Sequence, residues 1–203
     1  MMSPTHPETP DEALRILLEG NERHRAGKQE LRSYSPLGDR HSEGQRPFAA
    51  IIACADSRVS PTLIFDLDRG NLFASKVAGN SIDTGTLGST EFAVATLDVT
   101  LVVVLGHSDC GAVKAAIDVA DGRNSYPPDQ YGSIGSVVDA VVPSVKSLPA
   151  EQRTLPSCVA ANARAQAKEI EATEPVVGPA VEAGRLRVVA AVYDVASGRV
   201  ELV

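Results

Sequence analysis

Two short motifs, far apart in the sequence, carry side chains that could hold a metal ion. Cys54 follows one apolar run, while His107 and Cys110 stand three positions apart after another. Two thiolates and one imidazole suit Zn²⁺, which prefers tetrahedral coordination. A structural zinc site usually closes all four positions with Cys or His, whereas a catalytic site leaves one position for water. The three residues therefore predict an open zinc site.

A carboxylate and a guanidinium accompany the first thiolate. Asp56 and Arg58 lie within four residues of Cys54. A carboxylate near two thiolates is repelled, but an arginine offers two parallel donors that keep it ionised and oriented. A solvent-exposed ion pair is the alternative interpretation. The remaining cysteine, Cys158, lies in a helical pattern, and we expect it in the core.

The strands predicted around these motifs should bring them together. Residues 48–54 and 100–106 form continuous apolar runs, which are typical of strands covered on both faces. Further strands are predicted over 71–78, 186–193 and 199–203, and helices over 86–97, 110–119, 155–173 and a region ending at 147. This alternation predicts an α/β fold with a mostly parallel, Rossmann-like central sheet flanked by helices. Ligands collect beyond the carboxyl ends of such strands, where both motifs fall.

The N-terminal region reads as a tail followed by an arm. Residues 1–10 contain three prolines among polar residues, so we predict a flexible tail there and a single domain over 11–203. A helical arm follows, with Leu14, Leu17 and Leu18 on one face, and Gly20 with Asn21 is predicted to weaken or end its first part. Residues 27–47 are polar and turn-rich, which indicates an irregular connector.

Composition excludes several kinds of partner. The 203 residues carry a formal net charge of -7, which argues against nucleic acids and anionic membranes. No run approaches the ~18 apolar residues that a membrane span needs, and no basic segment precedes an apolar one at the N-terminus. Three scattered cysteines make a poor disulfide framework, so we expect a reducing compartment, the cytoplasm.

Three segments closely resemble the beta-class carbonic anhydrases: C-A-D-S-R-V at 54–59, K-V-A-G-N at 76–80 and G-H-S-D-C-G-A-V at 106–113. The resemblance continues in E-G-N-E-R at 19–23, G-Q-R-P at 44–47, C-V-A-A-N-A-R-A-Q at 158–166 and V-Y-D-V-A-S-G-R-V at 192–200. It implies an enzyme that reversibly hydrates carbon dioxide to bicarbonate and a proton, with one Zn²⁺ per subunit. It also implies a homodimer, or a homotetramer, in which the arm over 11–47 crosses onto the partner.

The resemblance also implies roles for individual residues. Asp56 corresponds to an aspartate that accepts a hydrogen bond from the zinc-bound hydroxide, and that becomes a fourth zinc ligand in some members. Arg58 corresponds to the arginine that holds this aspartate in place. Gln45 corresponds to a glutamine that reaches the substrate across the dimer interface, although an ordinary loop glutamine is the alternative. Gly111 offers a backbone N–H to the substrate near the metal.

Two departures from the family pattern bear on regulation. Lys76 replaces an arginine, and Ile51 replaces the tryptophan of members with a noncatalytic bicarbonate pocket, although Tyr193 matches that pocket. Because lysine lacks the planar fork of arginine, we expect weak or absent regulation by bicarbonate. Three isolated histidines are candidates for proton transfer, although most isolated surface histidines have no such role: His6, His24 and His41.

Three other functions remain open from the residues. The same fold and zinc could hydrolyse carbonyl sulfide or carbon disulfide. A noncatalytic zinc-binding module would use the metal only to fasten two loops, but it would need neither Asp56 nor Arg58. A thiol redox protein would use Cys54 and Cys110 and would leave His107 without a purpose.

Overall fold

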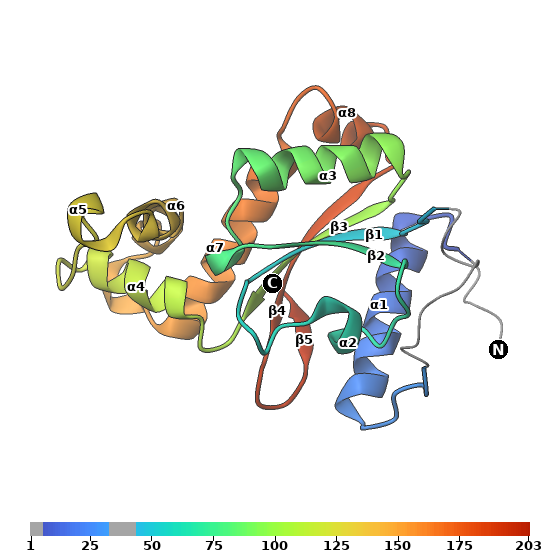
Figure 1. Cartoon of the computed structure of the whole chain (residues 1–203), viewed down its shortest axis with the longest axis horizontal. Coiled ribbons are helices and arrows are strands. Elements are labelled where there is room, and N and C mark those ends of the chain that lie inside the picture. Colours follow the sequence, from blue (N-terminus) through green and yellow to red (C-terminus); the bar gives the residue numbers. More distant parts are fainter. Residues whose placement is uncertain (1–5, 33–43) are drawn as a thin grey trace.

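The computed structural model describes residues 6–32 and 44–203, and its centre is a five-stranded sheet in the order β2-β1-β3-β4-β5 (Figure 1). The first four strands pair in parallel, and β5 is antiparallel to β4. The strands are β1 (Ala49–Ala53), β2 (Leu72–Lys76), β3 (Leu101–His107), β4 (Arg187–Tyr193) and β5 (Val200–Leu202). The predicted α/β fold with a mostly parallel sheet is therefore confirmed.

Helices follow most of the strands. They are α1 (Pro10–Arg25), α2 (Pro61–Ile64), α3 (Thr84–Thr96), α4 (Gly111–Ala120), α5 (Pro128–Tyr131), α6 (Ile134–Lys146), α7 (Leu155–Glu171) and α8 (Val177–Glu182). The long helices lie where the apolar spacing predicts them. The short helices α2, α5 and α8 were not predicted, because segments of four to six residues are too short to display a helical period. No helix in the described parts of the chain has the length and apolar character to span a membrane.

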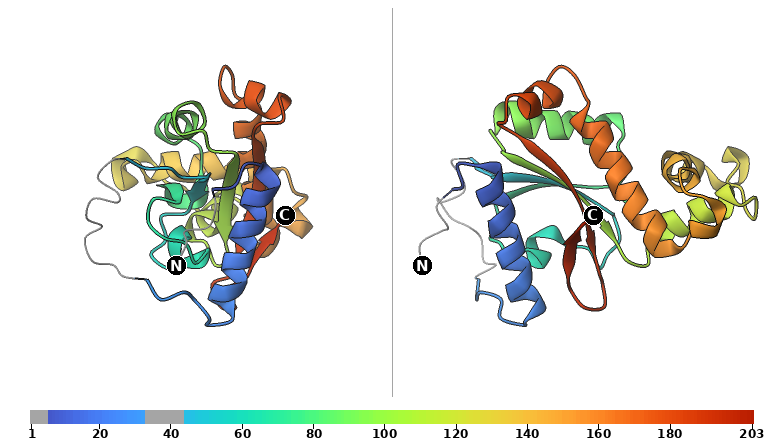
Figure 2. Two further views of the ribbon diagram at one scale, coloured as in Figure 1. Left: turned by 90° about the vertical axis from the view of Figure 1, so that its right-hand side faces the viewer. Right: turned by 180° about the vertical axis from the view of Figure 1, so that it is seen from behind.

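Alternate side chains of each strand face the two sides of the sheet. In β1, Ile51 packs with α1 and α2, while Ile52 packs with α3, α7 and α8. Figures 1 and 2 show α1 and α2 on one side of the sheet and α3 and α8 on the other. All residues of β1 and β3 are buried, which explains why both runs are continuously apolar.

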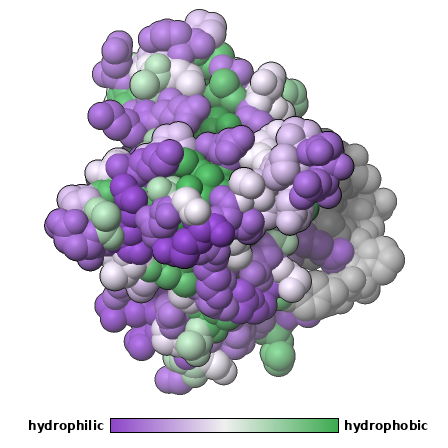
Figure 3. Space-filling view, turned by 90° about the vertical axis from the view of Figure 1, so that its left-hand side faces the viewer, coloured by the Kyte–Doolittle hydropathy of each residue, from purple (hydrophilic) through white to green (hydrophobic). Residues whose placement is uncertain are grey.

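A third apolar cluster lies outside the two sheet faces, between α4, α6 and the start of α7. It contains all three cysteines, Cys54, Cys110 and Cys158. Cys158 is fully buried, as predicted. Seen from the α4–α6 side, the surface is mainly hydrophilic, with small separate apolar groups (Figure 3). The cluster therefore places two predicted zinc ligands at the edge of a packed core.

Helix α1 continues through Gly20 and Asn21, so the predicted weakening there is wrong. A Cβ at Gly20 would lie 1.8 Å from the carbonyl oxygen of Phe65, so glycine allows the helix to approach that backbone. The Asn21 amide donates to the carbonyl oxygens of Ile64 at 3.1 Å and Gly198 at 2.8 Å. Both residues serve tertiary packing, which outweighs their low helix propensity.

The start of α1 is capped by its own sequence. The Thr9 hydroxyl accepts from the Glu12 N–H at 3.2 Å, and Pro10 stands at the first helical position. Within the predicted tail, Pro7 is buried and residues 1–5 lie outside the described residues. The domain boundary at residue 10 stays a prediction.

A buried aspartate ties α1 and the start of the connector to the loop after α2. The Asp66 side chain is 2% exposed and pairs with Arg32 and with Arg23 Nε at 2.6 Å. It also accepts from the Glu30 N–H at 3.3 Å. Burial raises the pKa of Asp66, but the hydrogen bonds from both arginines outweigh burial and leave the pKa lowered.

Replacing Asp66 with Asn is expected to lower the free energy of unfolding at pH 7 by roughly 2–4 kcal/mol, because two cations lose their partner. A carboxyl group with a lowered folded-state pKa stabilises the fold above its unfolded pKa of about 3.9, and this contribution disappears as pH falls through the folded value. The difference between wild type and Asp66→Asn should therefore shrink in acid. Urea unfolding over a pH series measures it.

Asp98→Asn is the matched control for this experiment. Asp66 and Asp98 both have a positive φ, of 45° and 53°, but the Asp98 side chain is exposed. It should change stability by less than about 0.5 kcal/mol. Equal losses in the two variants would contradict the role given to Asp66.

Candidate metal centre

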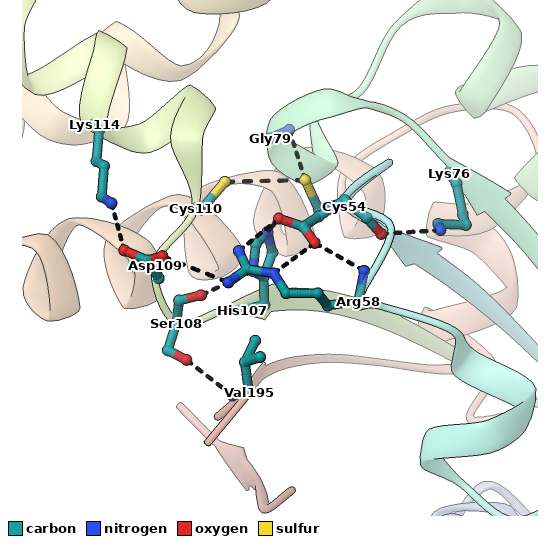
Figure 4. Close-up of polar contacts among 11 residues, drawn as sticks. Cys54, Arg58, Lys76, Gly79, His107, Ser108, Asp109, Cys110, Lys114 and Val195 are labelled. Atoms are coloured by element: carbon teal, nitrogen blue, oxygen red, sulfur yellow. Dashed lines mark hydrogen bonds and ion pairs between the residues drawn. The ribbon is translucent and has the colours of Figure 1, made fainter. Parts of the chain in front are cut away.

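The sheet brings the two motifs to one edge. Strands β1 and β3 are parallel neighbours, with Ala53 opposite Leu105. Cys54 follows the last residue of β1, His107 is the last residue of β3, and Cys110 caps the start of α4. The carboxyl ends of both strands thus present all three side chains to the same space (Figure 4).

The three predicted ligands converge and are almost completely buried. The sulfurs of Cys54 and Cys110 are 3.9 Å apart, and one ligand atom from each residue lies within 4.8 Å of the others. His107 is 0% exposed. Within residues 6–32 and 44–203, this is the one group of three or more potential ligands close enough to share a metal ion. Two sulfurs and one nitrogen fit Zn²⁺.

The orientation of His107 supports metal binding. Its Nδ1 lies 2.9 Å from the Ser108 carbonyl oxygen and donates to it, so the lone pair is on Nε2. Nε2 is buried and has no hydrogen-bond partner among the described residues. Leaving such an atom unsatisfied costs about 1–3 kcal/mol, which coordination to a metal offsets. The Ser108 carbonyl acts as the outer partner typical of a metal-bound imidazole.

Ser108 is itself held by the next strand. Its N–H donates to the Tyr193 carbonyl oxygen at 2.8 Å, and its hydroxyl accepts from the Val195 N–H at 2.9 Å (Figure 4). The loop between β3 and α4 therefore cannot rotate freely. This anchoring fixes the carbonyl that orients the His107 ring.

The surroundings of Cys54 favour its thiolate form. The Cys110 thiol donates to Cys54 and is the main cause of the low pKa of Cys54, about 4. Burial opposes this shift, while backbone N–H groups, including that of Gly79 at 3.4 Å, add to it. The pKa of Cys110 is raised in return, because it holds the proton between the sulfurs. Thiolates are the metal-binding form of cysteine.

Asp56 lies beside the three ligands and is held by Arg58. Arg58 donates from Nε to Oδ1 at 2.9 Å and from its terminal nitrogen to Oδ2 at 2.7 Å, and its own N–H donates to Oδ1 at 2.9 Å. This hydrogen bonding keeps the pKa of Asp56 well below its usual range. Asp56 Oδ2 is 3.9 Å from His107 Nε2. An ionised acceptor therefore stands next to the predicted metal position.

Asp109 and Lys114, which the sequence did not single out, lie near this pair together with Lys76. Asp109 Oδ2 lies 3.5 Å from an Arg58 nitrogen, and its other oxygen pairs with Lys114. Lys76 donates to the Asp56 carbonyl oxygen at 3.2 Å, so it contacts the loop of the centre. The backbone of Asp109 has a positive φ of 62°, which sets the direction of its side chain. No pattern in the sequence predicts this backbone conformation.

The structure does not join every predicted site residue to the centre. Gly111 begins α4, next to Cys110, where its N–H has no partner within the helix. Gln45 is exposed ahead of β1, and no hydrogen bond links it to the three ligands in the described chain. Tyr193 pairs with His107 across the sheet, while Ile51 is buried in the core.

The predicted proton-transfer histidines lie apart from the ligands. His24 packs near the Tyr193 ring, with ring centroids 6.4 Å apart, and His6 packs on Phe48 at the same distance. His41 lies outside the described residues. Their roles stay predictions, as does weak regulation by bicarbonate.

The fold and the centre define the class: an α/β protein with a Cys–His–Cys metal group at two strand ends. Residues 49–200 match the family described as Carbonic anhydrase. A carbonic anhydrase of Mycolicibacterium smegmatis is 35% identical over 196 residues, which cover 95% of this chain and 93% of the relative. Carbonic anhydrase 2 of Mycobacterium tuberculosis is 45% identical over 138 residues, covering 67% and 64%.

Solved structures agree with these relatives. A Coccomyxa beta-carbonic anhydrase in complex with acetazolamide is 26% identical with a TM-score of 0.71, covering 98% of this chain and 87% of that one. A tetrameric beta-carbonic anhydrase of Sordaria macrospora is 25% identical with a TM-score of 0.66, covering 79% and 82%. The chain belongs to the beta-class carbonic anhydrase family, as its motifs predict.

Membership defines the enzyme and its substrate. The protein is a carbonic anhydrase, a lyase that acts on carbon dioxide and bicarbonate. This outcome argues against the noncatalytic module and the thiol redox protein. The identity of the metal and the roles of individual residues are a separate question.

Proposed function

We propose that the enzyme reversibly hydrates carbon dioxide at one zinc ion per subunit, held by Cys54, His107 and Cys110. The observation that carries this proposal is the buried His107 Nε2, which faces two sulfurs and has no hydrogen-bond partner in the described chain. Zinc supplies the nucleophile, because it lowers the pKa of a water molecule in its open position toward neutrality.

Asp56 orients the nucleophile in this proposal. Its carboxylate is ionised and can only accept a hydrogen bond, so the attacking oxygen would donate a hydrogen bond to Asp56, keep its proton, and present a lone pair to carbon dioxide. Arg58 keeps the carboxylate in position through its two parallel hydrogen bonds. The same pair opposes movement of Asp56 onto the metal, so Asp56 becomes a fourth ligand only if Arg58 releases it.

Two further groups complete the proposed substrate site. The Gly111 N–H points from the start of α4 and can donate to a bicarbonate oxygen. Gln45 donates from the partner subunit in a homodimer, which agrees with its exposure in the single chain. In this arrangement residues 11–203 are one domain, and the arm over 11–47 contacts the partner in addition to its own sheet, on which α1 packs. A homotetramer is the alternative.

The three cysteines support a reducing compartment, which we propose to be the cytoplasm. Cys54, Cys110 and Cys158 are all free and buried. Two free thiolate ligands need protection from oxidation, because zinc binds the reduced form.

Metal analysis followed by a stopped-flow assay of carbon dioxide hydration tests the proposal. We expect one zinc per chain, and activity that disappears with a chelator and returns with zinc. Sulfide release from carbonyl sulfide, measured on the same sample, should be the slower reaction. Full activity without zinc, or faster hydrolysis of carbonyl sulfide, would contradict the proposal.

A further inference from the structure

Gly79 connects one predicted zinc ligand to a buried side chain on a distant helix. Its N–H donates to Cys54 Sγ at 3.4 Å (Figure 4). Its carbonyl oxygen accepts from Asn162 Nδ2 at 2.8 Å. Asn162 lies on α7 and is 0% exposed. The backbone of Gly79 is therefore held on both sides, by the sulfur and by the amide.

A serine on α6 determines which way the Asn162 amide faces. Ser144 Oγ lies 3.1 Å from Asn162 Oδ1 and 2.7 Å from the Val141 carbonyl oxygen, so one hydroxyl proton is shared between two acceptors. With Oδ1 turned toward Ser144, the Asn162 NH₂ group faces Gly79. A buried chain thus runs from Ser144 through Asn162 and Gly79 to Cys54.

The backbone at Gly79 has little room to adopt another path. Its φ is +71°, in the left-handed region that favours glycine. A Cβ there would lie 2.9 Å from Val141 Cγ2 and 3.2 Å from Ala112 Cβ. Because α4 and α6 enclose the residue, the hydrogen bond from Asn162 selects one orientation of a tightly confined backbone.

The direction of the Gly79 N–H matters to the sulfur that it meets. A donor aimed at a buried thiolate withdraws negative charge from sulfur and fixes the lone pairs left for a metal. If the Gly79 carbonyl lost its buried donor, it would be left unsatisfied, and its peptide would rotate slightly within the narrow space between α4 and α6. The N–H of the same residue would turn with it.

We propose that Asn162 is a positioning residue for the metal centre. Through Gly79 it aims an N–H at Cys54 and so sets the charge on that sulfur and its affinity for zinc. The residue touches neither the metal nor the substrate. The inference rests on the proposed zinc site, and it assigns that site a supporting residue more than fifty positions from each proposed ligand in the sequence.

Asn162→Leu tests this role, because leucine has a similar size and no donor. We expect zinc affinity, measured by competition with a chelator, to fall roughly 10- to 100-fold. In the cobalt-substituted enzyme, the sulfur-to-cobalt charge-transfer band should move to lower energy, because Cys54 becomes richer in electrons. A purely structural residue would not shift that band.

Gln166→Leu is the matched control. Gln166 lies one turn further along α7, is also buried, and accepts from the Ile82 N–H at 2.6 Å. Its loss removes a comparable buried hydrogen bond without reaching Cys54. The control should keep the wild-type charge-transfer band and zinc affinity.

Ser144→Ala provides a milder variant that removes one hydroxyl. It should shift the band in the same direction as Asn162→Leu, by less. An unshifted band in both variants, or an equal shift in Gln166→Leu, would overturn the inference while leaving the zinc site intact. Failure of the wild-type enzyme to bind zinc would instead contradict the proposed function.

Discussion

Replacing His107 with Ala is expected to abolish stoichiometric zinc binding and to reduce carbon dioxide hydration to the uncatalysed rate. The variant leaves two thiols 3.9 Å apart and removes the nitrogen that completes the group. Loss of a ligand should exceed the roughly 10- to 100-fold loss of affinity typical of an outer partner. Zinc per chain, measured by mass spectrometry of the metal, and stopped-flow rates check both effects.

Cys158→Ala is the control for this result. Cys158 belongs to the same apolar cluster as the two proposed thiolate ligands and is fully buried, but it does not belong to the ligand group. It should lose some stability and keep both zinc and activity. The ligand assignment fails if His107→Ala retains one zinc per chain, or if Cys158→Ala loses it.

Replacing Asp56 with Ala should separate catalysis from metal binding. We expect zinc content to stay near one per chain, because three ligands remain, while kcat/KM falls by about 10²- to 10³-fold through loss of a preorganised acceptor. Arg58, whose side chain is 44% exposed, can be hydrated when its partner is removed. Metal analysis and stopped-flow hydration of the same preparation measure the two quantities.

The role of Arg58 is tested by replacing Arg58 and Asp56 together. If Arg58 acts only through Asp56, the double variant Asp56→Ala/Arg58→Ala should be no slower than Asp56→Ala alone. Because Arg58 holds the pKa of Asp56 well below its usual range, Asp56 should contribute no inflection to the rate profile near neutral pH. Independent, additive losses from the two changes would contradict the proposed pairing.

The sheet was predictable where burial acts on both faces. The runs that become β1 and β3 are apolar without interruption because α1 and α2 cover one side and α3, α7 and α8 cover the other. The continuation of α1 was not predictable. Gly20 reads as a helix breaker until the Phe65 backbone that it accommodates is known. Asn21 likewise satisfies backbone groups in segments more than forty residues away.

The Cys–His–Cys group proposed to bind the metal was predictable because its residue types are rare and their positions follow two strands. Neighbouring parallel strands bring their carboxyl ends together whatever lies between them in sequence. The residues proposed to support the metal centre have no comparable pattern in the sequence. Asn162 acts through a backbone amide 83 residues away, and Asp109 depends on a left-handed backbone conformation. Gln45 is singled out by the family resemblance alone, because its proposed contact lies between subunits.

The most direct test of the metal centre is X-ray absorption at the zinc edge of the purified enzyme. The proposed centre predicts two sulfur neighbours near 2.3 Å and two nitrogen or oxygen neighbours at about 2.0–2.1 Å, from His107 and one small ligand. The Asp56→Ala variant should give the same pattern. Three or four sulfur neighbours, or a purified active enzyme without zinc, would contradict an open centre built from Cys54, His107 and Cys110.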